Sequence, residues 1–187
     1  MKVTMVMLSS IDGKITNGKD PDVYAWTSPE DQKLFFPLIK KNNLIVMGRK
    51  TYEASKSVIK LENGKLRIVL TRNPKKYFNQ SVKGQLEFTD ETSRELVKRL
   101  SALGYKNLLL VGGGIINGLF LKKNLVDELF LTIEPMIFGI GKNIVEGQLL
   151  NTKLQLISSR KLNKTGTLLL KYVVRNDTRL TNNSSFL

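Results

Sequence analysis

The sequence predicts an α/β fold with a mixed, mostly parallel sheet, helices on both faces of that sheet and an antiparallel hairpin at the C-terminal end. Three observations lead to this class. Apolar runs of strand length alternate with helical patterns over the first part of the chain. The last part instead holds long strand-like segments with short connections, which is typical of antiparallel pairing. With 187 residues, 41% of them hydrophobic and 25% charged, the chain can bury one core.

The N-terminal part predicts a strand, a long loop and a helix. Lys2 to Leu8 is an apolar run of the length of a buried strand, and the polar stretch from Ser9 to Trp26 predicts a loop long enough to serve a function. Ser28 is a good N-cap, and a proline and two acidic residues follow it. Apolar side chains then recur with helical spacing, which predicts a helix from Pro29 to about Lys41.

The same alternation continues through the middle of the chain. The expected strands cover Leu44–Met47, Arg67–Leu70, Leu86–Phe88 and Leu108–Val111. The expected helices run from Gly48 to about Ser57, from a cap at Thr89 or Asp90 through Leu100, and from Ile115 to about Lys122. Thr71 to Pro74 has the composition of a turn.

The C-terminal part changes character. Val126–Glu134, Leu154–Leu162 and Thr167–Arg175 predict three long strands that close the sheet. No repeat or linker divides the chain before this point, so we expect one domain over residues 1–175. The composition then turns polar, and residues 176–187 are expected to form a disordered tail.

The composition excludes several kinds of catalytic chemistry. The chain contains no histidine and no cysteine. It therefore has no thiol nucleophile, no disulfide, no serine–histidine pair and no imidazole or thiolate metal ligand, and we expect no metal site. A catalyst built from this chain must use carboxylates, lysine, tyrosine, backbone groups or a cofactor that it binds.

The charge is strongly positive, with 30 basic and 16 acidic residues and a net charge of +14. An AT-rich genome that favours lysine is one explanation, and an anionic ligand is another. The lysines are scattered in short pairs rather than in runs of five or more, and no nucleic-acid-binding motif is visible. A phosphate-bearing small molecule is therefore a better candidate partner than a nucleic acid.

The first apolar run is too short for the core of a signal peptide, and no stretch approaches the roughly 20 apolar residues of a membrane span. These two features predict a protein that works in the cytoplasm, without a membrane partner.

Three predicted strands end in residues suited to binding phosphate. These segments are Gly48-Arg49-Lys50-Thr51, Thr71-Arg72-Asn73 and Gly112-Gly113-Gly114. Ligands of open α/β sheets bind outside the carboxyl ends of the strands, glycines let the backbone approach a ligand, and the helix that follows offers free N–H groups. Each feature also has a plainer explanation: a glycine run forms tight turns, and a single arginine is usually a solvated surface charge.

Acidic side chains near the first strand and the first helix are the remaining candidates. Asp12 lies in Ser10-Ile11-Asp12-Gly13-Lys14, where it serves either a function or the turn alone. Glu30 and Asp31 are most simply first-turn acids that complement the helix dipole.

Taken together, these segments resemble a known family. Ser9-Ser10-Ile11-Asp12-Gly13-Lys14-Ile15 is similar to the opening of the C-terminal reductase domain of the bifunctional riboflavin-biosynthesis deaminase/reductase. Trp26-Thr27-Ser28, the triple glycine, Leu125 to Leu129 and Ile133 to Gly139 also resemble that domain. The domain belongs to the dihydrofolate reductase superfamily, whose own pattern is similar to Ile45 to Thr51 and Val69 to Arg72. The resemblance covers about Lys2 to Arg175.

The resemblance implies a dihydrofolate-reductase-like fold and NADPH as the cofactor, which would supply the hydride that this chain cannot. The cofactor-binding residues that it implies are Gly48, Arg49, Thr51, Thr71, Arg72, Gly112, Gly113, Gly114, Ile115 and Ile116. The expected substrate-binding residues are Trp26, Ser28, Glu30 and Asp31. Lys14 is expected to deliver a proton as the catalytic residue, with Asp12 orienting the substrate.

The leading interpretation is an NADPH-dependent reductase of a pyrimidine- or pterin-like heterocycle, resembling 5-amino-6-(5-phosphoribosylamino)uracil reductase. Dihydrofolate reduction is the alternative among enzymes, in which case Glu30 or Asp31 rather than Lys14 would be essential. A non-catalytic nucleotide- or RNA-binding protein is the alternative of another class. The long C-terminal strands also suggest a homodimer in which they pair across the interface.

Overall fold

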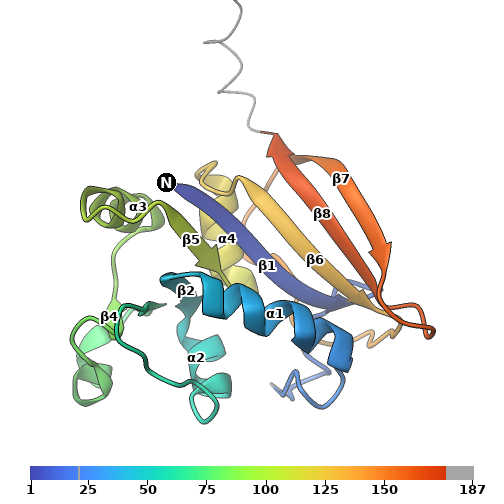
Figure 1. Ribbon diagram of the computed structural model, residues 1–187, viewed down its shortest axis with the longest axis horizontal. Helices are drawn as coiled ribbons and strands as arrows, with labels where there is room; N and C mark the ends of the chain where they lie inside the picture. Colours follow the sequence, from blue (N-terminus) through green and yellow to red (C-terminus); the bar gives the residue numbers. More distant parts are fainter. Residues whose placement is uncertain (21, 176–187) are drawn as a thin grey trace, which may run out of the picture.

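The computed structural model describes residues 1–20 and 22–175, and the expected tail lies outside the described residues. One sheet of eight strands runs through this part of the chain in the order β4-β3-β2-β5-β1-β6-β8-β7 (Figure 1). The strands are β1 (Lys2–Ser10), β2 (Leu44–Gly48), β3 (Leu66–Leu70), β4 (Leu86–Thr89), β5 (Asn107–Leu110), β6 (Glu128–Glu134), β7 (Lys153–Lys161) and β8 (Leu168–Arg175). The helices are α1 (Pro29–Lys41), α2 (Arg49–Ser55), α3 (Ser93–Ala102) and α4 (Gly114–Lys122), with one 3₁₀ helix, η1 (Pro74–Gln80).

The six strands from β4 to β6 in this order are all parallel, whereas β8 runs antiparallel to β6 and β7 antiparallel to β8. This arrangement confirms the predicted class, a mostly parallel sheet with a C-terminal antiparallel hairpin. Parallel strands place their carboxyl ends at one edge of the sheet. The segments after β2, β3 and β5 therefore share that edge.

Helices cover both faces of the parallel part of the sheet (Figure 1). One face packs against α3 and α4 through a core that includes Leu96 and Leu100 of α3 and Phe120 of α4. The other face packs against α1, α2 and η1, with Tyr52 and Tyr77 buried there. Alternate residues of β2 serve the two cores, as expected for a strand buried on both sides.

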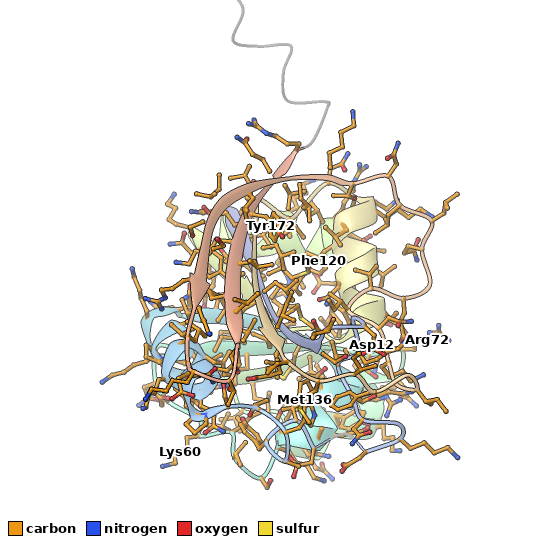
Figure 2. All side chains as sticks on the ribbon, turned by 90° about the vertical axis from the view of Figure 1, so that its right-hand side faces the viewer. Asp12, Lys60, Arg72, Phe120, Met136 and Tyr172 are labelled. Atoms are coloured by element: carbon orange, nitrogen blue, oxygen red, sulfur yellow. The ribbon has the colours of Figure 1, made fainter. Side chains whose placement is uncertain are left out.

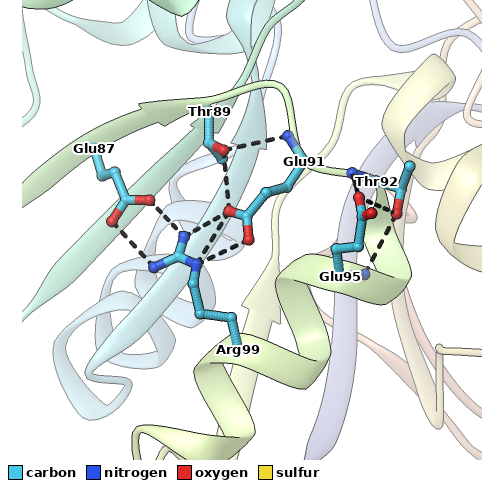
Figure 3. Close-up of polar contacts among 6 residues, drawn as sticks. All are labelled: Glu87, Thr89, Glu91, Thr92, Glu95 and Arg99. Atoms are coloured by element: carbon cyan, nitrogen blue, oxygen red, sulfur yellow. Dashed lines mark hydrogen bonds and ion pairs between the residues drawn. The ribbon is translucent and has the colours of Figure 1, made fainter.

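The start of α3 differs from the prediction. Thr92, not Thr89 or Asp90, is the N-cap, and its hydroxyl accepts from the Glu95 N–H while the Glu95 carboxylate accepts from the Thr92 N–H (Figure 3). Thr89 instead bonds to Glu91. A Thr-x-x-Glu pair just before an apolar run is a capping box, so the correct start was present in the sequence.

An ion-pair cluster attaches this helix to the neighbouring strand. Arg99 of α3 bonds to Glu87 of β4 and to Glu91 in the connection that follows it (Figure 3). Hydrogen bonds to Glu91 raise the pKa of Arg99, with burial acting the other way. The cluster fixes α3 beside β4 on the side of the sheet away from β7.

Two other local predictions need correction. The segment after Thr71 is not only a turn, because Asn73 caps a 3₁₀ helix from Pro74 to Gln80. The helix α2 ends at Ser55, two residues earlier than expected. Among the described residues no helix has the length and apolarity needed to span a membrane.

Candidate active site

A cleft of about 2240 Å³ opens beside α1 and continues over the carboxyl ends of β2 and β3 to the first turn of α4. Side chains from two loops, within residues 15–24 and 140–148, complete its wall. The cleft thus lies where open α/β sheets bind ligands. Nine of the ten predicted cofactor residues line it, and Gly112 is the exception.

The carboxyl ends of β2 and β5 meet beside this cleft. Each of the three glycines that follow β5 is subject to a different structural constraint. Gly112 has a φ of +93° and accepts a hydrogen bond from the Gly48 N–H over 2.7 Å. A Cβ on Gly114 would lie 2.3 Å from the Asn143 carbonyl oxygen. A Cβ on Gly113 would meet nothing closer than the Thr51 hydroxyl at 3.4 Å, so the space beside Gly113 belongs to the cleft.

The N-terminus of α4 begins in this space. Gly113 is its N-cap, and no side chain caps the helix. The first N–H groups of a helix and its dipole attract anions. Gly114, Ile115 and Ile116 line the cleft at this point.

Basic side chains also line the cleft. Arg49, Arg72 and Lys76 belong to the segments that follow β2 and β3, and Lys122 and Lys123 lie at the C-terminal end of α4. The Arg49 guanidinium pairs with Glu53 at 2.5 Å, and the Tyr77 hydroxyl donates to the other oxygen of that carboxylate. The hydrogen bond that Arg49 donates to Glu53 raises the pKa of Arg49, and the hydrogen bond from Tyr77 lowers the pKa of Glu53.

Arg72 has no such partner within the described part of the chain. Its side chain is exposed, follows the end of β3 and lies at the rim of the molecule in Figure 2. An unpaired guanidinium that lines the same cleft as an uncapped helix N-terminus is well suited to a phosphate group.

On the opposite wall, Asp31 of α1 is the predicted substrate residue that lines the cleft. Burial raises the pKa of Asp31, a hydrogen bond from Thr132 lowers it, and the nearby charge of Glu134 raises it again. Thr132 and Glu134 are alternate residues of β6, so their side chains point to the same side of the sheet. A carboxyl group in this environment holds its proton to a higher pH than a solvated aspartate does.

The C-terminal end of α1 lies near two further basic side chains, those of Lys65 and Arg67. Arg67 of β3 has a side chain only 5% exposed, and one of its terminal nitrogens has no hydrogen-bond partner. Its nearest carboxylate, that of Glu62, is 3.9 Å away. Burial lowers the pKa of Arg67, and Glu62 raises it. Lys65, only 6% exposed, makes two long contacts of 3.4 Å, to Glu62 and to the Lys40 carbonyl.

Asp12 and Lys14 do not line the cleft. The Asp12 carboxylate accepts from the Ser10 hydroxyl at 2.6 Å and from the backbone N–H groups of Phe138 and Gly139. The hydrogen bond from Ser10 lowers the pKa of Asp12 to about 2, with those two backbone groups contributing. The Lys14 ammonium donates to the Asn143 side chain at 2.8 Å. Both residues thus join the loop after β1 to the loop after β6.

Trp26, Ser28 and Glu30 also lie outside the lining. Ser28 is the N-cap of α1, as predicted, and Glu30 contacts Asn163. Trp26 packs edge-on against Phe138 with ring centroids 5.0 Å apart. These residues support the wall that carries Asp31.

The sequence reasoning missed Arg67, Thr132 and Glu134. Arg67 lies within the apolar strand β3, and Glu134 lies at the end of the largely apolar strand β6. A charged residue in a segment expected to be a buried strand is unusual, so the sequence could have pointed to both. Thr132 carries no such signal.

The family assignment agrees with this geometry. Residues 1–168 match the model of the RibD C-terminal domain. The chain belongs to the RibD C-terminal domain family. YwjB and YyaP of Bacillus subtilis strain 168, both named as uncharacterized proteins, are similar to it. They are each 24% identical, over 86% of this chain and 91% of YwjB and over 85% of this chain and 88% of YyaP.

Solved structures of this RibD-like kind share the fold. A pyrimidine reductase-like protein from Corynebacterium diphtheriae superposes with a TM-score of 0.72 at 16% identity, covering 94% of this chain and 92% of that one. A diaminohydroxyphosphoribosylaminopyrimidine deaminase/5-amino-6-(5-phosphoribosylamino)uracil reductase from Thermotoga maritima superposes with a TM-score of 0.70 at 15% identity. It covers 92% of this chain and 56% of that one. The dihydrofolate-reductase-like fold expected from the sequence is confirmed.

Proposed function

We propose that this RibD C-terminal domain protein is an NADPH-dependent reductase of a pyrimidine- or pterin-like heterocycle, resembling 5-amino-6-(5-phosphoribosylamino)uracil reductase. One observation carries the proposal: a single cleft joins nine predicted cofactor residues to the half-buried carboxyl group of Asp31 on α1. The first set suits a dinucleotide, and the second suits a ring that must receive a proton.

The residues present fit NADPH. The open space beside Gly113 and the uncapped start of α4 would hold the pyrophosphate, and Arg49 and Arg72 would hold the additional phosphate of the adenosine ribose. Thr51 and Thr71 would orient the cofactor from α2 and from the end of β3. Bound there, the cofactor supplies a hydride, and this chain's own residues bind the substrate and move the proton.

Asp31 is the favoured proton donor. Its carboxyl group faces the cleft and is biased toward the protonated form, which is the form that donates. Lys14, the residue favoured by the sequence, bonds to Asn143 away from the cleft. In our proposal Lys14 and Asp12 therefore shape the loop wall, and Asp31 acts on the substrate.

The buried cations at the far end of α1 support a substrate with an anionic arm. Asp31 and Lys40 are nine residues apart on this helix, which corresponds to roughly 14 Å along its axis. A heterocycle near Asp31 with a pentose phosphate reaching Lys65 and Arg67 fits that span. An anion there would offset the charge of Arg67, whose closest carboxylate is 3.9 Å away.

Dihydrofolate reduction is the second candidate, because Asp31 lies on the first helix and receives a hydrogen bond from Thr132 on the sheet. A carboxyl group of this kind suits a pterin ring as well as a pyrimidine. RNA binding is less well supported, since the sequence contains no visible nucleic-acid-binding motif.

The test begins with a thermal shift in the presence of NADPH, NADH or RNA, and continues with NADPH oxidation in the presence of 5-amino-6-(5-phosphoribosylamino)uracil or dihydrofolate. We expect stabilisation by NADPH above NADH and RNA, and turnover of the phosphorylated pyrimidine. Stabilisation by RNA alone would overturn the proposal, and turnover of dihydrofolate alone would favour the second candidate.

Asp31→Asn should lower kcat by about 10²–10⁴-fold, the usual value of general acid catalysis, with the Kd of NADPH unchanged. Because the raised pKa means that ionised Asp31 destabilises the fold, this substitution should also increase the free energy of unfolding at neutral pH. Lys14→Met is the comparison. If Lys14→Met is inactive and Asp31→Asn is active, the roles are reversed.

We also propose a homodimer in which the exposed strand β7 of one protomer pairs with that of its partner. All nine residues of β7 are exposed, and Leu154, Leu156 and Ile157 are 44%, 50% and 59% exposed.

A further inference from the structure

Glu134 is a buried carboxylate that the proposed reaction does not use directly. Glu134 lies at the end of β6 and is only 3% exposed. One carboxylate oxygen accepts from the Ser28 backbone N–H at 2.8 Å. The other accepts from the Thr167 hydroxyl at 2.6 Å. Glu134 therefore joins the N-cap of α1 to the start of β8.

This attachment fixes the position of Asp31. Ser28 caps α1 by accepting a hydrogen bond from the Asp31 N–H at 3.3 Å, so the carboxylate that holds Ser28 lies two hydrogen bonds from the Asp31 backbone. Thr132, on the same side of β6, bonds to the Asp31 side chain. The end of β6 thus holds Asp31 at both its backbone and its side chain.

The charges that act on Asp31 come from the same surroundings. Glu134 faces it from β6, Tyr24 faces it from the segment before α1, and Glu30 is its neighbour on the helix. Among the described residues that shift its pKa, none is a cation. The negative charge of Glu134 makes a second negative charge on Asp31 less favourable.

We propose that Glu134 is a positioning residue: it holds Asp31 toward the substrate, and its negative charge makes ionisation of Asp31 less favourable. This inference rests on the proposed role of Asp31 as proton donor.

Glu134→Gln separates charge from structure. The glutamine oxygen can still accept from Ser28, and its NH₂ group can donate to the Thr167 hydroxyl oxygen, which has two lone pairs and uses only one of them to accept from Asn163 at 2.8 Å. The substitution removes the negative charge and reverses the direction of the hydrogen bond with Thr167. Glu128→Gln is the matched control, because it makes the same change at the other end of β6, where Glu128 pairs with Lys2.

The first measurement follows the ionisation of the Asp31 carboxyl group in the protein without any bound ligand. Protein labelled with ¹³C at aspartate carboxyl groups is titrated by NMR, with Asp31→Asn assigning the signal. We expect Glu134→Gln to move the Asp31 midpoint to lower pH and Glu128→Gln to leave it in place. An unchanged midpoint in Glu134→Gln would overturn the inference.

The second measurement is the pH profile of kcat with NADPH and 5-amino-6-(5-phosphoribosylamino)uracil. The fall in kcat at high pH should begin at lower pH in Glu134→Gln, with a several-fold loss at pH 8 and the same KM, since each pKa unit changes the protonated fraction tenfold. Loss of kcat at every pH, with an unchanged midpoint, would mean that Glu134 is structural only.

If Glu134→Gln does not fold, the wild-type protein labelled at glutamate carboxyl groups gives the answer. The Glu134 signal should then show an inflection at the Asp31 midpoint, and Asp31→Asn should abolish it. A Glu134 signal without that inflection contradicts the inference. A wild-type protein that shows the inflection but oxidises no NADPH would instead contradict the proposed function alone.

Discussion

Arginine side chains at the ends of parallel strands explain how a small chain could choose between two nicotinamide cofactors. Arg72 has no carboxylate partner within the described residues, whereas Arg49 is held by Glu53. A guanidinium that is already paired gives up part of that pairing when it binds a phosphate. Arg72 is therefore the residue on which discrimination should depend most.

Arg72→Ala should weaken NADPH binding by about one to two decades, because a hydrogen bond to a charged group contributes roughly 1.5–3 kcal/mol. NADH binding should hardly change. Calorimetric titration with both cofactors measures the difference. Arg94→Ala, on α3 and outside the cleft, is the control. An equal loss for both cofactors in Arg72→Ala would refute the assignment.

The glycine triple allows a second prediction at the scale of single residues. Gly113→Val should abolish NADPH binding while the fold is retained, because the new side chain would occupy the cleft and its backbone, at φ −79° and ψ −167°, is one that valine adopts. Thermal unfolding and cofactor titration separate the two effects.

Gly114→Ala is the matched comparison. Its Cβ would lie 2.3 Å from a backbone oxygen, so we expect a loss of about 1–3 kcal/mol in the free energy of unfolding. If Gly113→Val binds NADPH normally, the triple glycine is a turn and nothing more.

At the scale of elements, two loops far apart in the sequence form one wall of the cleft. Ile15 and Gly18 donate backbone hydrogen bonds to Lys142 and Ile140, and the Asp12 carboxylate holds the N–H groups of the loop after β6. These hydrogen bonds, called the loop latch below, give Asp12 a structural role. Helix α1 has no fully buried residue, and Leu38 and Ile39 attach it to the core while Ser28 caps its N-terminus.

Asp12→Ala should release the loop after β6. We expect hydrogen exchange at the Phe138 and Gly139 amides to accelerate by about tenfold or more, since both lose a charged acceptor. Asp20→Ala, whose carboxylate bonds only locally to Asp22, should leave these amides protected.

The loop latch should respond to acid in the wild-type protein. A pKa lowered to about 2 means that the stabilisation by Asp12 is complete above about pH 4 and is lost as the pH falls toward 2. Protection of the two amides should fall in that window. Unchanged protection at pH 2 would show that other contacts hold the loop.

At the scale of the whole molecule, the sheet has two different ends. The β4 end is tied to α3 by Arg99, whereas β7, whose residues are exposed, ends the sheet on the other side (Figure 1). An exposed edge strand is a template for pairing with another chain. The lysines at its two ends, Lys153 and Lys161, and the register shift beside Ile157 act against that pairing.

We expect light scattering to show a dimer. Ile157→Lys should raise the dissociation constant of this dimer by about tenfold or more, because it places a charge in an apolar contact. Higher salt should strengthen the wild-type dimer, because it screens the repulsion between the terminal lysines. Leu103→Lys, on an exposed leucine beyond α3, is the control. A monomer at all salt concentrations would mean that the lysines and the register shift protect the edge.

The sequence by itself determined which segments of the chain form strands and helices, and which residue types follow the ends of the strands. Those features depend on local patterns: runs of apolar residues, glycines, caps and the rule that parallel strands share an edge. This is why the fold and the glycine and arginine segments were predicted, whereas the predicted start of α3 was wrong because Thr89 or Asp90 was taken as the cap and the capping box of Thr92 and Glu95 was missed.

Only the tertiary structure decided which acid faces the cleft. Glu30 and Asp31 are adjacent, and the rotation of α1 about its axis, set by packing, turns Asp31 into the cleft and Glu30 toward Asn163. Asp12 is satisfied by partners 126 and 127 residues away, and Glu134 by Ser28, 106 residues away. Such pairings depend on distances in the folded chain, which no local pattern of side chains specifies.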